Sequence, residues 1–166
     1  MRFRLLLLWV AVAAVALAQP LSAATDTRLI TVSATVAASA KLTLSVATVT
    51  FPDADPDLVL SIPNTEGAIT VTAKGKTTTG SFVTLTLQAA GDLASGSDTI
   101  AISNVTWTAA GAGFVAGTMS SVSAVPVGSW ANSGSRTGAL SFFLANSWAY
   151  PVGAYSVGAT YTLTAP

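Results

Sequence analysis

Apolar and polar residues alternate with a period of two along most of this chain, and this pattern limits the folds open to it. Ile69, Val71 and Ala73 are separated by Thr70 and Thr72. Similar alternation recurs at 30–36, 42–46, 83–87, 100–107, 140–144 and 155–163. Because successive side chains of a strand point to opposite faces of a sheet, the alternation predicts half-buried β-strands. No segment combines helical apolar spacing with a cap and a closing glycine.

Turn-forming residues separate these segments, and together they predict the fold class. Clusters of Gly, Pro, Asp, Ser and Asn occupy 52–57, 75–80, 91–98, 111–117 and 128–138. We expect 75–80 to be a hairpin loop, and a slip of the alternation near Ala47 to be a β-bulge. Seven to nine antiparallel strands predict an all-β, immunoglobulin-like antiparallel sandwich. A closed barrel is the alternative.

The first 24 residues have the features of a signal peptide. Arg2 and Arg4 precede an unbroken apolar run of 14 residues, Leu5 to Ala18, and small residues follow at 22–24. This run is shorter than the roughly 20 residues of a membrane-spanning helix, although a retained anchor is the alternative. We expect export through the Sec route to the periplasm, the cell surface or the medium.

Cleavage after Ala24 leaves residues 25–166, which are 166 − 24 = 142 residues, as a single predicted domain. Ala18 and Ala23 offer alternative cleavage points. No second stretch of the chain is long and apolar enough to cross a membrane. The predicted mature chain is therefore expected to have no membrane span.

The composition limits the chemistry open to the chain. It has no His and no Cys, and charged residues make up 8% of it. Histidine bases, thiolate nucleophiles and zinc sites built on either residue are therefore excluded. With a formal net charge of +0, the chain has no general attraction for nucleic acid. We predict a protein without enzymatic activity and without a cofactor.

The acidic loop at 52–57 has carboxylates at a spacing typical of metal ligands. Asp53, Asp55 and Asp57 alternate, as ligands do in some calcium loops. However, Leu58 and Asn64 stand where an EF-hand loop needs glycine and glutamate. The alternative is a solvated turn in which the aspartates bond to their own backbone.

Three aromatic residues are candidates for a ligand platform. Trp148 and Tyr150 are two apart, so they share a face if the chain is extended there, and Trp130 lies in a stretch rich in Ser, Asn and Gly. Exposed aromatic rings stack on sugars or fill pockets of a protein partner. The alternative is packing in the core of the sandwich.

The two terminal segments, 29–38 and 153–164, alternate most regularly. A terminal strand is free to pair with another molecule, because backbone bonds supply affinity and alternate side chains fill a groove. We predict that Ile30, Val32, Ala34 and Val36 form a donor strand. We predict an acceptor groove beside a C-terminal strand that contains Gly153, Tyr155, Val157, Ala159, Tyr161 and Leu163. The alternative is that both segments close their own sandwich.

A family resemblance rests on the same two ends. The stretch TVSATVAAS at 31–39, followed by LTL at 42–44, resembles the opening of the spore coat protein U-like family. The stretch GAYSVGATY at 153–161 resembles that family's closing strand. The resemblance implies a secreted β-sandwich and, for some members, a pilus subunit of the archaic chaperone–usher route. In that route each subunit lends its N-terminal strand to the next.

A fainter resemblance concerns the last residues, 161–166, which are similar to WxL cell-wall-binding domains. The sequence thus leaves two functional hypotheses. The first is a non-enzymatic structural or adhesive surface protein, such as a pilus (fimbrium) or coat subunit, which assembles by strand addition. Its expected partners are further copies, other surface subunits and a periplasmic chaperone. The second is a module that binds carbohydrate or cell wall.

Overall fold

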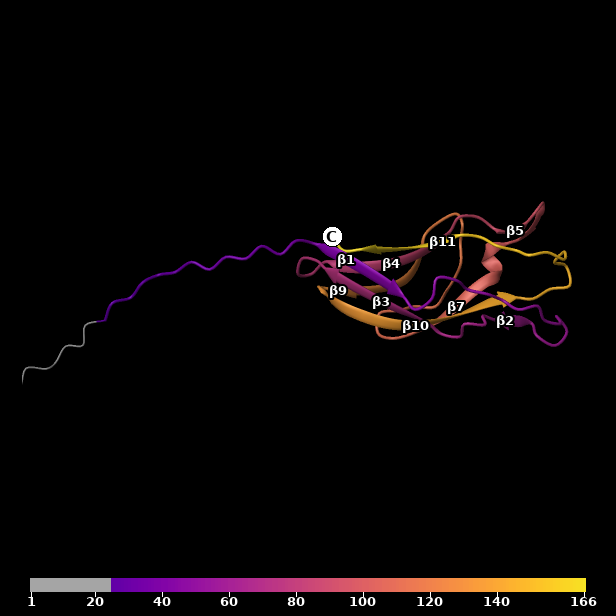
Figure 1. Cartoon of the computed structure of the whole chain (residues 1–166), viewed down its shortest axis with the longest axis horizontal. Coiled ribbons are helices and arrows are strands. Elements are labelled where there is room, and N and C mark those ends of the chain that lie inside the picture. The colour runs from indigo at the N-terminus through magenta and orange to yellow at the C-terminus, as the bar shows by residue number, and fades with distance from the viewer. Residues whose placement is uncertain (1–24) are drawn as a thin grey trace, which may run out of the picture. The chain divides into compact units, whose positions relative to one another are not determined.

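Two antiparallel sheets pack against each other in the computed structural model, which describes residues 25–166 (Figure 1). The predicted all-β sandwich is confirmed. Residues Thr35–Pro166 form one compact unit, and the chain up to Ala34 is counted as a separate one. The described residues 25–34 are exposed and form no strand. The predicted signal peptide, 1–24, lies outside the described residues.

The described residues contain eleven strands and one short 3₁₀-helix. The strands are β1 (Ser39–Leu44), β2 (Ser61–Pro63), β3 (Ile69–Lys76), β4 (Phe82–Ala89), β5 (Leu93–Ser95), β6 (Asp98–Ile100), β7 (Val105–Ala110), β8 (Gly117–Thr118), β9 (Val125–Ala131), β10 (Gly134–Ala145) and β11 (Ala159–Thr164). The 3₁₀-helix spans Ile102–Asn104. Seven strands are six residues or longer, namely β1, β3, β4, β7, β9, β10 and β11.

The larger sheet has the order β1-β3-β10-β7-β8, and β2 pairs with the far end of β10. The smaller sheet has the order β11-β4-β9, with a register shift between Leu85 and Thr86 of β4. A separate ribbon, β5-β6, is tied to the chain before β11 by a bridge between Ala94 and Ser156. Strands β1 and β11 are therefore outer strands of two different sheets.

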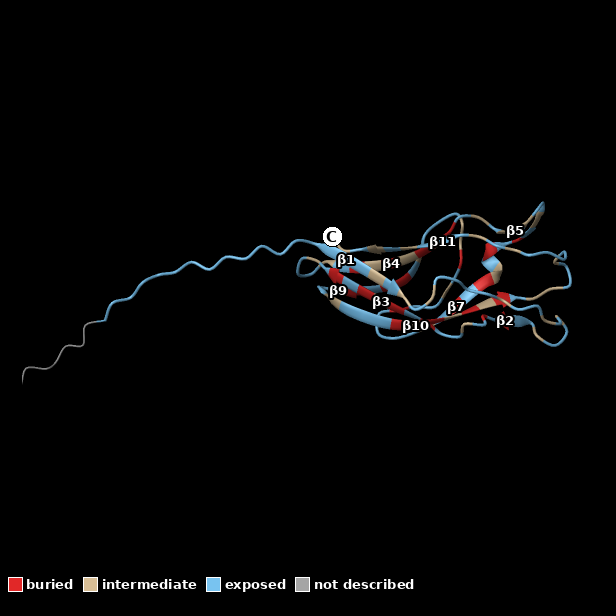
Figure 2. Ribbon diagram, viewed as in Figure 1, coloured by how far each residue is buried: buried red, intermediate tan, exposed pale blue. Residues whose placement is uncertain are grey.

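The core lies between the sheets and explains the alternation. Val71 and Leu140 from the larger sheet are fully buried, as are Leu85 and Val127 from the smaller sheet. Trp107 is 2% exposed and donates its indole N–H to the carbonyl of Val115 at 2.9 Å. Along β3 and β4, buried residues alternate with exposed or half-buried ones, as Figure 2 shows. This is the two-fold periodicity that the sequence displays.

Two predicted turns are corrected by the structure. The 75–80 loop is not a hairpin, because β3 belongs to the larger sheet and β4 to the smaller one. The loop crosses from one sheet to the other, with Gly80 at φ 86°. The predicted loop 128–138 is mostly strand, since β9 extends to Ala131 and β10 begins at Gly134. Asn132, at φ 66°, makes the tight connection between them.

The structure also corrects where the predicted strands begin and end. There is no bulge near Ala47, because β1 ends at Leu44 and the chain leaves the sheet. The predicted N-terminal strand, 29–38, forms no strand, and strand structure begins only at Ser39. The C-terminal strand begins at Ala159 rather than at Gly153. The alternation at 29–38 thus has no ladder partner among the described residues, whereas the stretch before β11 pairs only through the isolated Ala94–Ser156 bridge.

Candidate functional site: the groove between β1 and β11

One side of the sandwich is open between β1 and β11. The two strands lie next to each other, but no β-ladder joins them in the described part of the chain. Strand β1 pairs only with β3, and β11 pairs only with β4. Each strand therefore keeps one edge of backbone N–H and C=O groups free, which is the feature that accepts an added strand.

The groove is lined by apolar side chains that are only half buried. Leu42, Leu44 and Val46 come from β1 and the residues after it, and Tyr161 and Leu163 come from β11. All five pack against the core yet remain partly exposed. The hollow has a volume of about 540 Å³, and its lining includes Leu44, Ala47, Ala159 and Tyr161. The sandwich thus shows part of its core to solvent here.

Burial also changes the pKa of the Tyr161 phenol, which belongs to the groove wall. Removal of the Tyr161 side chain from water raises its pKa to about 12. The phenol therefore stays neutral at any physiological pH. No described carboxylate or cation lines this hollow, whose walls are mainly apolar with Ser45 and Thr160 among them.

The opposite side of the sandwich, where β8 and β9 are the outer strands, is closed by a segment of the chain, and we call it the sealed side. Gly113 and Val115 bond to β9, with Val115 N–H donating to the Val127 carbonyl and Ser129 N–H donating to the Gly113 carbonyl, both at 2.8 Å. Phe114, between them, is 8% exposed and lies 6.2 Å from Trp130, centroid to centroid. A segment of the chain therefore completes this side, and nothing equivalent completes the β1–β11 side within the described residues.

The predicted donor residues are exposed. Ile30 is 82% exposed, Val32 87% and Val36 75%, and Ala34 is also exposed. Leu29, on the other face of this segment, is exposed too. Several large apolar side chains are therefore next to one another in solvent, which is uncommon on the surface of a monomeric protein.

The predicted C-terminal residues separate into two groups. Ala159, Tyr161 and Leu163 lie in β11 and line or flank the groove. Gly153, Tyr155 and Val157 precede β11. Gly153 is needed for close packing, because a Cβ there would collide with the Ser95 side chain. The Tyr155 hydroxyl donates to the Pro151 carbonyl at 2.8 Å.

The predicted aromatic platform is not assembled as one surface. Trp130 lies in β9 and is 6% exposed, so the prediction that it sits in an open loop is wrong. Trp148 is 70% exposed and donates its indole N–H to Asp57 Oδ1 at 3.0 Å. Tyr150 packs against the core, and its hydroxyl donates to the Ala145 carbonyl. Trp148 and Tyr150 lie in a turn rather than on an extended strand.

The acidic loop takes the alternative, solvated-turn form. Asp55 Oδ1 accepts the N–H of Asp57 at 2.9 Å, and Asp57 accepts the Trp148 indole. Asp53 joins neither of these hydrogen bonds. Within residues 25–166, no group of three or more His, Cys, Asp or Glu side chains is placed to hold a metal ion. The calcium interpretation therefore receives no support from the geometry.

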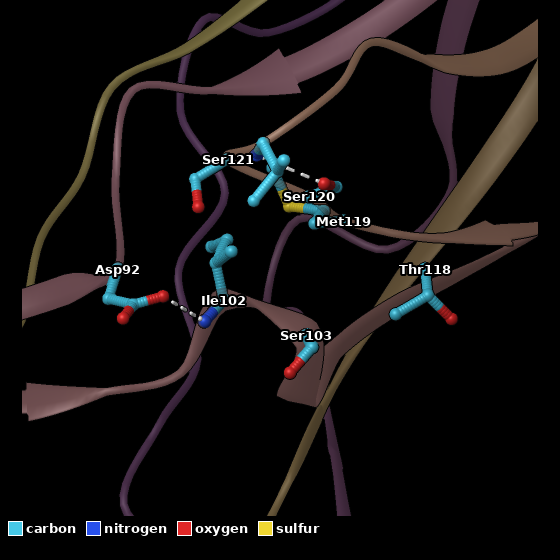
Figure 3. Close-up of a pocket in the computed structure, with 8 residues that line it drawn as sticks. Asp92, Ile102, Ser103, Thr118, Met119, Ser120 and Ser121 are labelled. Carbon is cyan, nitrogen blue, oxygen red and sulfur yellow. Dashed lines mark hydrogen bonds between the residues drawn. The ribbon is translucent and has the colours of Figure 1, made fainter.

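A second, shallow hollow of about 390 Å³ lies near the end of β8 (Figure 3). Asp92, Ser103, Ser120 and Ser121 are among its lining residues. Asp92 Oδ1 accepts the backbone N–H of Ile102, the first residue of the 3₁₀-helix, at 2.8 Å, which ties this carboxylate to the helix.

Two features of the site were not predicted from the sequence. Strand β1 is the second wall of the groove, and only its alternation at 42–46 indicated a strand there. The Phe114 seal was also missed. Its signal was a bulky aromatic residue in a run that contains Gly111, Gly113 and Gly117.

No helix among the described residues is long and apolar enough to span a membrane. Comparisons with protein-family models, with curated proteins and with solved structures find no match for this chain.

Proposed function

We propose that this chain is a non-enzymatic subunit of an exported surface assembly, such as a pilus or coat, and that copies join by strand addition. In this proposal residues 29–36 of one copy insert into the β1–β11 groove of another. The open groove, with half-buried apolar walls and two free strand edges, is the observation that carries the proposal. The exposed alternating segment of the same chain fits what such a groove needs.

The sequence between the donor segment and β1 favours insertion into another copy. To reach its own groove beside β1, the segment would have to reverse direction just before Ser39. Residues 36–39 read Val-Ala-Ala-Ser and contain no Gly, Pro, Asn or Asp, the residues with the strongest turn chemistry. No residue of 36–39 is assigned to a turn, and Ser39 opens β1. These features support a second copy as the occupant.

Export and a chaperone complete the proposal. The predicted signal peptide would bring the chain out of the cytoplasm. Until a donor arrives, the apolar groove is a hazard, because exposed strand edges promote aggregation. A periplasmic chaperone that covers the groove would remove this hazard, as the resemblance to chaperone–usher subunits implies. The absence of His and Cys from the sequence supports a structural role over a catalytic one.

Deletion of the donor segment tests the proposal. The chain is expressed with its N-terminal leader, both intact and without residues 27–38, and the exported proteins are compared by sedimentation and thermal melting. The intact protein should form multimers with a raised melting temperature, because a filled groove stabilises the fold. The shortened protein should be monomeric. Two stable monomers with equal melting temperatures would exclude strand addition.

A second candidate function, glycan or cell-wall binding, is favoured by Trp148 alone. Its ring is exposed, and the hydrogen bond to Asp57 fixes its orientation, which suits stacking on a sugar. A glycan array should show binding that Trp148→Ala abolishes and that Leu58→Ala, another exposed residue, leaves unchanged. Equal binding by the wild type and Trp148→Ala would remove this candidate.

A further inference from the structure

The cations of the Thr35–Pro166 unit gather at one end of the sandwich. They are Lys41, Lys74, Lys76 and Arg136, and all four are exposed. Lys41 is directly opposite Lys74 in the β1–β3 ladder, and Arg136 is opposite Ala73 in the β3–β10 ladder. Three neighbouring strands therefore place these charges within a few residues of each other. We call this the basic end; it lies where β1 begins and the chain terminates (Figure 1).

The carboxylates gather at the other end, which we call the acidic end. They are Asp53, Asp55, Asp57, Glu66, Asp92 and Asp98. Strand β10 begins at the basic end and finishes at Ala145. The next residue, Asn146, donates to the carbonyls of Ala54 and Val59, which holds the 52–60 loop at this far end. The loop carries three of the six carboxylates.

The other three carboxylates share this location. Glu66 accepts the Thr50 backbone N–H and precedes the start of β3, whereas Lys74 is near the end of that strand. Asp92 and Asp98 flank β5, and β5 is bridged to Ser156, just before β11 begins. Figure 1 shows β2 and β5 at the end of the sandwich opposite the start of β1.

These charges are not neutralised within the unit. In the described part of the chain the one salt bridge is Arg28–Asp26, which lies before this unit. The basic end therefore carries four unpaired cations and the acidic end six unpaired carboxylates. Such a separation gives the sandwich a strong charge dipole along its length.

We infer that opposite charges steer the docking of copies, with the acidic end of one sandwich facing the basic end of the next. The inference rests on the proposed strand addition and adds the electrostatic attraction that directs it. Complementary charges steer association and fix the orientation of encounter, while like ends repel. The occupant of each charged end is thus a second copy of this chain.

Head-to-tail docking fixes how the donor enters. Ser39 opens β1 at the basic end, so the donor segment is joined to its own copy at the basic end. The acidic end of the next copy faces them, and its groove opens there between Ala47 and Ala159. The donor therefore lies with residue 36 near this mouth and Ile30 deeper in the groove. The groove wall at 40–47 and the donor at 29–36 contain the same number of residues, so the donor can extend along the whole wall.

This direction fixes how the donor runs relative to each wall of the groove. Gly75 pairs with Ala40, and a Cβ on Gly75 would lie 3.4 Å from that of Ala165, so the beginning of β1 faces the end of β11. The two groove walls thus run in opposite directions. A donor that enters at the acidic end runs antiparallel to β11 and parallel to β1. Every ladder among the described residues is antiparallel, and antiparallel pairing is slightly the more stable, so we expect the donor to form its ladder with β11.

Directed cross-linking tests the orientation, because the chain has no Cys of its own. A donor copy with Ala37→Cys is mixed with acceptor copies that lack 27–38 and carry either Ala47→Cys or Ala165→Cys. Disulfides require Cα atoms within about 7 Å, so Ala47→Cys should give at least about tenfold more cross-linked dimer. Equal yields, or more dimer with Ala165→Cys, would overturn the inference while leaving strand addition intact. If donor and acceptor copies fail to bind at all, the proposed function fails and the inference fails with it.

Charge reversal tests the steering. A basic-end variant carries Lys41→Glu, Lys74→Glu and Lys76→Glu, and an acidic-end variant carries Asp53→Lys, Asp55→Lys, Asp57→Lys and Asp98→Lys. Each variant alone should assemble at least about tenfold more slowly than the wild type at low salt, since its two ends now have the same sign. A mixture of the two should recover the wild-type rate. The triple Lys→Arg variant is the control and should also keep that rate. Wild-type rates in the separate variants, or no recovery in the mixture, would overturn the inference.

Discussion

The Phe114 ring lies directly against the backbone of Gly138, so closely that a Cβ on Gly138 would stand 2.5 Å from the ring carbons. Phe114 comes from the segment that bonds to β9, and Gly138 lies in β10 of the other sheet. This contact therefore joins the two sheets along the sealed side. The contrast with the open β1–β11 side is the basis of the proposed function.

Gly138→Ala should destabilise the sandwich by about 1–3 kcal/mol, because the added methyl overpacks a site that has no space for it. Urea unfolding of the two proteins measures the difference. Gly91→Ala is the matched control, since a Cβ at Gly91 meets no atom within 4 Å. Equal destabilisation by both substitutions would mean that the Phe114 contact is not the cause.

Val32→Asp should abolish assembly and leave the melting temperature of the unassembled protein unchanged. Val32 is 87% exposed, so its charge costs nothing until the segment enters an apolar groove. Thr31→Asp places the same charge on the opposite face of the segment and should assemble nearly normally. Sedimentation of both variants measures how far each one assembles. Loss of assembly in both would show that the alternation of the segment does not matter.

Asn64→Ala should destabilise the fold by about 2–3 kcal/mol. Asn64 is the one polar residue in the buried core of the described chain. Its Oδ1 accepts the Phe142 N–H at 3.1 Å, and its Nδ2 donates to the Gly67 carbonyl at 2.8 Å. The substitution leaves these groups without partners, which is costly in a buried site. Asn104→Ala is the control. If urea unfolding showed the same loss of stability for both substitutions, the lost hydrogen bonds of Asn64 would not be the cause.

Stability should fall between about pH 4.5 and pH 2 because of Glu66. The backbone N–H of Thr50 donates to its carboxylate at 3.0 Å and lowers its pKa from 4.5 to about 2. A lowered pKa in the folded state stabilises the fold above pH 4.5, and this stabilisation disappears as the pH falls toward 2. Melting curves of the wild type and Glu66→Gln should therefore differ at pH 6 and converge near pH 2. A constant difference across this range would contradict the linkage.

The strands could be predicted because burial on one face leaves a direct mark on the sequence. Val71 and Leu85 face the core, and their polar neighbours face solvent, so period two identifies both strands. The same pattern does not record which sheet a strand joins. Both β3 and β4 present apolar faces to one core, and the 75–80 loop looks like a hairpin although it crosses between sheets.

The donor segment remains a prediction from its alternation, whereas the groove depended on topology. Ile30 and Val32 alternate like core residues and are nevertheless exposed, a conflict that only the structure reveals. The apposition of Leu44 and Tyr161 depends on β1 and β11 being the outer strands of different sheets. Trp130 was misplaced because the Ser and Asn residues around it indicate a turn, yet the strand β9 passes through them.

Hydrogen–deuterium exchange of the backbone amides tests the central claim most directly. A synthetic peptide of residues 28–38 is added to the protein that lacks 27–38, and exchange is followed along the whole chain. The account predicts slower exchange in β1 and β11, the two strands with free edges, and no change in β8 or β9 on the sealed side. Unchanged exchange in β1 and β11 at saturating peptide, or protection confined to the sealed side, would contradict it.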